Sequence, residues 1–122
     1  MVTFDEVAAM LDEIADGLPE AFFKDLNGGV YLLPEAKRHD KSRKNQPLFI
    51  LGEFTSQEVT GKCIYMYYGS FMEVYSHLTA DKLKKELKDV LIHEFTHHLE
   101  LLAGQNDLVI KDENKMKRYS RQ

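Results

Sequence analysis

The most constraining feature of the sequence is a helix-forming stretch near the C-terminal end, LKKELKDVLIHEFTHHLELL (residues 83–102). Neither glycine nor proline interrupts residues 80–103, and Gly104 suits the left-handed residue that ends a helix. Thr79 or Asp81 can serve as its N-cap. Apolar residues recur on one flank of the helical wheel, and acidic residues and histidines recur on another. This pattern predicts an amphipathic helix whose polar stripe borders a cleft.

The predicted helix contains the motif H-E-x-x-H at residues 93–97. Helical spacing puts His93 and His97 on one face, so their ring nitrogens can converge on one Zn²⁺ at about 2.0–2.1 Å. Glu94 lies about 100° further round the helix, where its carboxylate can act as the general base of a metal-dependent hydrolysis. We therefore predict one catalytic zinc ion per chain. The alternative is a solvated helix face that carries two histidines by chance.

A catalytic zinc usually takes three protein ligands, and the sequence leaves the third one open. We expect Asp107, because it follows Gly104 by three residues, where the chain has left the predicted helix and can fold back. Glu100 would have to reach back along the helix axis by about 7 Å. It is better placed to hydrogen-bond a ligand histidine, although it remains an alternative ligand. The weaker candidates are Asp89 and Asp112, and His98 is expected to be structural.

Length and composition restrict the class of protein. We expect residues 1–122 to form one domain, and 43% hydrophobic with 30% charged residues is ordinary for a soluble globular protein. A net charge of −4 argues against nucleic-acid binding. There is neither a bilayer-spanning apolar run nor a signal peptide, so we expect a cytoplasmic protein with no membrane partner. Cys63, the single cysteine, is expected to be a buried strand residue.

The rest of the chain predicts helices first and short strands later. Thr3 and Glu6 form a capping box for a helix to about Asp16, and Pro19 begins a short helix to about Leu26. Strands are expected at residues 30–33, 48–54 and 62–68, and a short helix or turn at 71–76. The last two strands suggest a hairpin, one strand of which can form a sheet edge that pairs with an extended peptide.

Two shorter features complete the pattern. Gly52 marks a bulge or a close backbone approach within its strand. Residues 35–47 form a basic segment without periodicity, for which we expect a solvated loop; the alternative is a loop that bounds the cleft and attracts an acidic partner. Nothing in the spacing supports His39 as a metal ligand. The apolar triplet at residues 108–110 is expected to pin the tail to the body.

These motifs resemble the small single-domain zincin-like metallopeptidases of bacteria, which have a minimal zincin fold. The likeness rests mainly on VLIHEFTHHLE and extends to the N-terminal LPE, LFILGEF and IYMYYGSF. It implies an α+β fold in which a short mixed sheet packs against N-terminal helices and the long motif helix. By this resemblance His93 and His97 would be zinc ligands and Glu94 the base.

The chain departs from the family pattern after the motif. Family members commonly have glycine three residues after the second ligand histidine and an acidic ligand three residues further on. Here those positions hold Glu100 and Ala103, and the nearest Gly-x-x-Asp runs from Gly104 to Asp107. The identity of the third ligand depends on this difference.

Two functions follow from these observations. The first is a zinc-dependent metallopeptidase that hydrolyses peptide bonds in a peptide or protein substrate. The alternative is a catalytically weak or inactive, metal-stabilised module that binds a protein partner. A purely structural zinc fits less well, because structural sites favour four protein ligands, often cysteines.

Overall fold

The computed structural model describes residues 1–43, 45 and 47–106. Its fold is α+β, with a three-stranded mixed sheet and a separate two-stranded ladder. The elements in chain order are α1 (Phe4–Asp16), the 3-10 turn η1 (Glu20–Phe23), β1 (Gly29–Leu33), β2 (Lys37–Arg38), β3 (Phe49–Ile50), β4 (Gly52–Gln57), β5 (Gly61–Tyr67), α2 (Tyr68–Tyr75) and α3 (Ala80–Asn106).

The first helix forms where the sequence predicts it. The Thr3 hydroxyl accepts a hydrogen bond from the Glu6 N–H at 3.2 Å, and the Glu6 carboxylate accepts one from the Thr3 N–H at 3.0 Å. This reciprocal capping box satisfies two of the free donors at the helix start. The predicted second helix is wrong in type and extent: it is a 3-10 turn that ends at Phe23, and Asp25 adopts a left-handed φ of 63°.

The mixed sheet has the strand order β1-β5-β4, with β1 parallel and β4 antiparallel to the central β5. The predicted hairpin is therefore confirmed, and β4 is its edge strand among the described strands. The predicted single strand over residues 48–54 is divided, because the chain changes partner at Leu51: β3 pairs with β2, and β4 pairs with β5. The same ladder corrects the expectation of an irregular basic loop, since Lys37 and Arg38 form β2.

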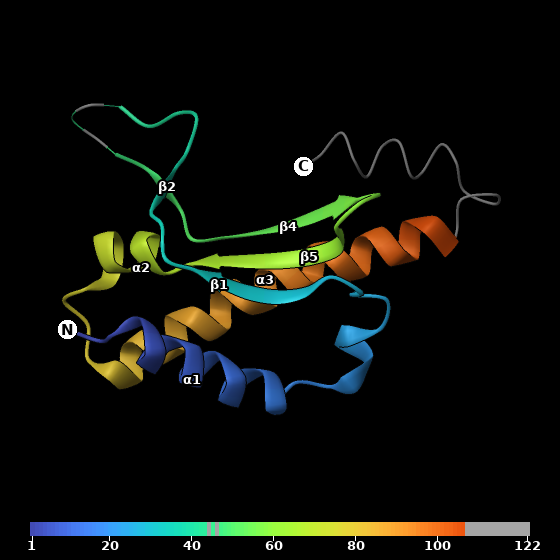
Figure 1. Ribbon diagram of the computed structural model, residues 1–122, viewed down its shortest axis with the longest axis horizontal. Coiled ribbons are helices and arrows are strands. Elements are labelled where there is room, and N and C mark those ends of the chain that lie inside the picture. The colour runs from blue at the N-terminus through green and yellow to red at the C-terminus, as the bar shows by residue number, and fades with distance from the viewer. Residues whose placement is uncertain (44, 46, 107–122) are drawn as a thin grey trace.

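The register shows which backbone groups of β4 face the open edge. The Leu51 carbonyl accepts a hydrogen bond from the Tyr67 N–H at 2.9 Å. Paired and unpaired residues alternate in an antiparallel ladder, so the N–H and C=O groups of Gly52 and Phe54 point away from β5. They lie at the open edge of the sheet, where no other described strand pairs with β4 (Figure 1).

The core lies between the sheet and helices α1 and α3, which cover the same face of it (Figure 1). The apolar flank of α3 is completely buried and packs against side chains from α1 and β5; its buried members are Leu83, Leu87, Leu91 and Phe95. Cys63 in β5 is buried, as expected.

Gly104 lies inside α3, which runs to Asn106, so the predicted helix stop is wrong. No described helix is long and apolar enough to cross a membrane.

Candidate metal centre and active site

The motif histidines meet on the exposed side of α3. The Nε2 atoms of His93 and His97 lie 3.2 Å apart, and their rings are nearly perpendicular, at 85°. Two nitrogens bound to a tetrahedral zinc at about 2.0–2.1 Å are separated by about 3.3–3.4 Å. The spacing of the two imidazoles therefore fits the binding of one zinc ion, and imidazole is a common zinc ligand.

Glu94 is buried beside this pair, with 7% of its surface exposed. Burial raises the pKa of its carboxyl group, against the opposing effects of His97, His93 and a hydrogen bond from the Phe54 N–H. A raised pKa makes a carboxylate a better proton acceptor near neutral pH. The side chain thus lies beside β4 and has an environment suited to proton transfer.

One face of α3 holds β4 in place through residues spaced four apart. Gly52 of β4 lies against Val90, so closely that a Cβ on Gly52 would be 3.0 Å from Val90 Cγ1. One turn later Glu94 faces the Phe54 N–H, and another turn later the His98 ring packs on the Phe54 ring, with 5.4 Å between their centroids. The close backbone approach expected at Gly52 is confirmed, and its cause is the contact with α3.

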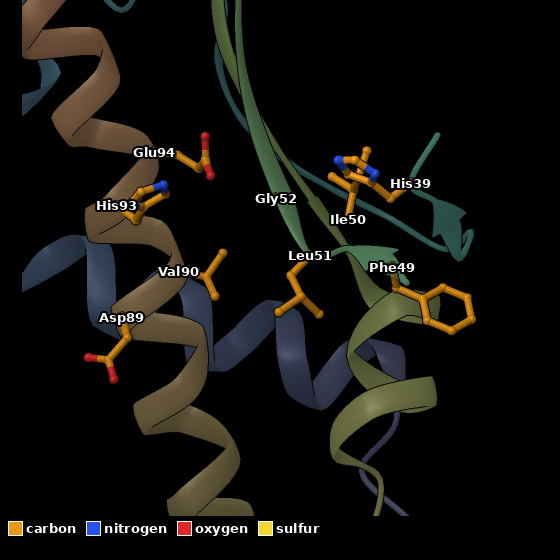
Figure 2. A pocket seen from close by; sticks show the side chains of 9 residues that line it. All are labelled: His39, Phe49, Ile50, Leu51, Gly52, Asp89, Val90, His93 and Glu94. Carbon is orange, nitrogen blue, oxygen red and sulfur yellow. The ribbon is translucent and has the colours of Figure 1, made fainter. Parts of the chain in front are cut away.

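A pocket of about 350 Å³ opens next to the motif (Figure 2). One wall comes from α3 and the other from the chain around β3 and the start of β4; the lining residues are His39, Phe49, Ile50, Leu51, Gly52, Asp89, Val90, His93 and Glu94. Figure 2 shows His39 across the pocket from His93 and Glu94. The sequence did not indicate His39, because only the pairing of β2 with β3 brings it here.

A polar network fixes β2 to the sheet near the pocket. Glu53 accepts hydrogen bonds from Lys37 Nζ at 2.5 Å and from the Tyr67 hydroxyl at 2.6 Å. Burial favours a higher pKa for Glu53, but the bonds from Lys37 and Tyr67 outweigh it and lower that pKa. Burial and the bond to Glu53 raise the pKa of Tyr67 to about 12.

The third predicted metal ligand falls outside what the structure describes. Within residues 1–43, 45 and 47–106, no group of three His, Cys, Asp or Glu side chains is arranged to hold a metal. Asp89 lines the pocket, and Glu100 lies on the next turn of α3 after His97, but neither completes such a group. Asp107, Asp112 and the apolar triplet at residues 108–110 are not among the described residues.

The α+β fold and the motif helix define a zincin-like protein, and residues 34–115 match the family described as zincin-like metallopeptidase. The chain belongs to this family, whose members typically depend on zinc. A conserved hypothetical protein from Thermus thermophilus has a similar solved structure, with 29% identity and a TM-score of 0.69. The match covers 84% of this chain and 99% of that one. No curated protein matches the sequence.

Proposed function

We propose that the protein is a zinc-dependent metallopeptidase in which His93 and His97 hold the metal and Glu94 is the general base. The observation that best supports this is the 3.2 Å separation of the two Nε2 atoms beside a buried carboxylate. When bound, zinc supplies a Lewis acid that activates water and polarises a substrate carbonyl. One ion per chain is proposed.

Glu94 has the position needed to move a proton. Its carboxylate lies in the pocket wall next to His93, and the Phe54 N–H faces it. In the proposed reaction this carboxylate accepts a proton from the attacking water and passes it to the leaving nitrogen of the peptide bond. A peptidase needs both transfers, because the amine leaves poorly as an anion.

The edge of β4 offers a way to hold the substrate. The Gly52 N–H and C=O face away from β5, and Gly52 also lines the pocket. An extended peptide can add to such an edge as a further strand, with its backbone hydrogen-bonded to Gly52. This pairing would place a peptide bond alongside the two histidines of α3.

The proposed site is completed by Asp107 as the third ligand, with Glu100 hydrogen-bonding a ligand histidine or replacing Asp107. The chemistry of the set supports this choice, since two histidines and one carboxylate form a common catalytic zinc site. A second candidate function is a metal-stabilised module that binds a protein without cleaving it. It is favoured by the fact that the described residues bring together only two metal-binding imidazoles.

Glu94→Gln distinguishes the two functions. We expect zinc content to stay at the wild-type level, while cleavage of a peptide library, followed by mass spectrometry, falls by about 10²–10⁴-fold. Glu13→Gln, a change on the exposed side of α1, is the matched control and should leave cleavage unchanged. A Glu94→Gln chain that cleaves as fast as wild type would contradict the assigned base. A zinc-loaded wild type that binds peptides without cleaving them would favour the binding module.

A further inference from the structure

The hairpin of β2 and β3 carries the pocket wall opposite the motif. His39 follows β2 directly, and its N–H extends the ladder by donating to the Leu48 carbonyl at 2.9 Å. The backbone of His39 is therefore fixed although its side chain is exposed. In Figure 2 the ring reaches from the hairpin toward α3, across from His93 and Glu94.

A local hydrogen bond determines which ring nitrogen of His39 is free to act. The Lys41 N–H donates to His39 Nδ1 at 3.0 Å. A ring that accepts a hydrogen bond at Nδ1 carries its proton on Nε2, so the ring presents an N–H donor. Among the described residues His39 belongs to no group of three metal-binding side chains. With its proton on Nε2, the ring can donate a hydrogen bond to a bound molecule.

The same hairpin concentrates positive charge in an acidic protein. Residues 37–47 contain five Lys or Arg and one Asp, whereas the whole chain has a net charge of −4. Lys37 is engaged by Glu53, but the exposed Arg38, Lys41 and Arg43 form no ion pair with any residue in the described part of the chain.

One of these cations contacts a residue of the pocket wall. The Arg38 guanidinium lies over the Phe49 ring, 5.7 Å from its centroid, and Phe49 is a lining residue. The opposite wall carries the carboxylates of Asp89 and Glu94. The hairpin that supplies one wall of the pocket thus carries exposed cations next to that wall, whereas the helix wall carries acidic lining residues, and such an asymmetry orients a charged ligand.

We propose that the β2–β3 hairpin selects the substrate. His39 donates from Nε2 to a backbone carbonyl oxygen of a bound peptide, and Arg38, Lys41 and Arg43 favour peptides with Asp or Glu side chains. The proposal rests on the proposed function for the location of the peptide, but it concerns binding and does not require hydrolysis.

The charge preference is tested on the zinc-loaded Glu94→Gln chain by fluorescence anisotropy. The probes are fluorescent peptide pools that are rich in Asp and Glu, or in Asn and Gln at the same positions. At low salt we expect the acidic pool to bind about three- to tenfold more tightly, with the difference shrinking as salt rises. The triple change R38E, K41E and R43E should abolish or reverse it.

The matched control makes the same change of charge at exposed lysines that do not line the pocket, Lys24, Lys82 and Lys85. This control chain should keep the preference for the acidic pool. The proposal is overturned if the chain with the wild-type hairpin shows no preference for the acidic pool. It is also overturned if the hairpin triple variant and the control triple variant lose this preference equally. Peptide hydrolysis by the wild type is assayed separately. If the wild type does not hydrolyse peptides, the proposed peptidase function is contradicted, but the binding measurements still decide whether the hairpin selects acidic peptides.

The role of His39 is tested with a variant that preserves the loop. His39→Asn keeps an acceptor for the Lys41 N–H and removes the Nε2–H donor. We expect it to weaken binding of both pools by about two- to tenfold, as His39→Ala should. His77→Ala, at an exposed histidine outside the pocket, should have no effect. Wild-type affinity in His39→Asn would overturn the assignment.

Discussion

The backbone N–H of Phe54 in β4 faces the carboxylate of Glu94 in α3 and acts to lower the pKa of that carboxyl group, against the effect of burial. The residue proposed as the general base thus lies beside the edge strand that is also proposed to bind the substrate. Two residues before Phe54, Gly52 allows β4 to approach α3 closely. The separation of β4 and α3 therefore affects how near the Phe54 N–H lies to the proposed base.

Gly52→Ala should disturb this geometry. The new Cβ would lie 3.0 Å from both Met66 Sδ and Val90 Cγ1, and 3.3 Å from the Tyr65 carbonyl oxygen. We expect a loss of about 1–3 kcal/mol in the free energy of unfolding, measured in urea, because a packed core resists insertion. The rate of peptide cleavage should fall by a larger factor than the affinity for zinc, because His93 and His97 do not take part in the contact between Gly52 and Val90.

The control for this change is Gly17→Ala. Gly17 has an ordinary helical φ of −88°, and its nearest new contact would be 3.6 Å away. It should leave stability unchanged or raise it slightly. Adding Val90→Ala to Gly52→Ala removes one of the clashes and should restore part of the lost cleavage. If Gly52→Ala behaves like Gly17→Ala, the close approach does not matter for function.

Glu53→Gln should lower stability in a pH-dependent way. The folded-state pKa of Glu53 is lowered from its ordinary 4.5, so its stabilising effect is present above that value and is lost as pH falls through the folded-state pKa. We expect the variant to be less stable by about 1 kcal/mol at neutral pH. The gap to wild type should narrow progressively as the pH falls below 4.5 in urea unfolding curves. A constant gap across this range would contradict the role of the Glu53 charge.

His98→Ala should separate the structural histidine from the metal-binding ones. His98 is completely buried, and its Nε2–H donates to the Lys24 carbonyl at 2.8 Å. Its loss leaves a cavity and an unpaired carbonyl, so the metal-free chain should lose about 2–4 kcal/mol of stability. Zinc binding to the folded chain should persist. Loss of zinc from a folded His98→Ala chain would show that this residue contributes to the metal site.

The features that the sequence predicts well are those that depend on neighbouring residues. The capping box of α1 needs only Thr3 and Glu6, and the motif geometry needs only helical spacing within α3. The family resemblance is confirmed, and so is the mixed α+β sheet. In each case local periodicity or a short motif carries the information.

The features that the sequence misses depend on distant partners. The break at Leu51 and the formation of β2 arise because the two strands pair with each other. His39 reaches the pocket through that ladder, and no spacing rule connects it to His93. Gly104 is buried and remains helical within α3, although glycine favours the end of a helix. The roles of the site residues and the third ligand stay predictions.

The most direct test of the account is the zinc content of the chain, measured after purification without added metal and after titration of the metal-free protein. The variants are His93→Ala and His97→Ala, with His77→Ala as the control. We predict about one tightly bound zinc per chain in wild type and control, and its loss in both motif variants. A wild type that takes up no stoichiometric zinc at neutral pH, or a His97→Ala chain that binds it as tightly, would contradict the account.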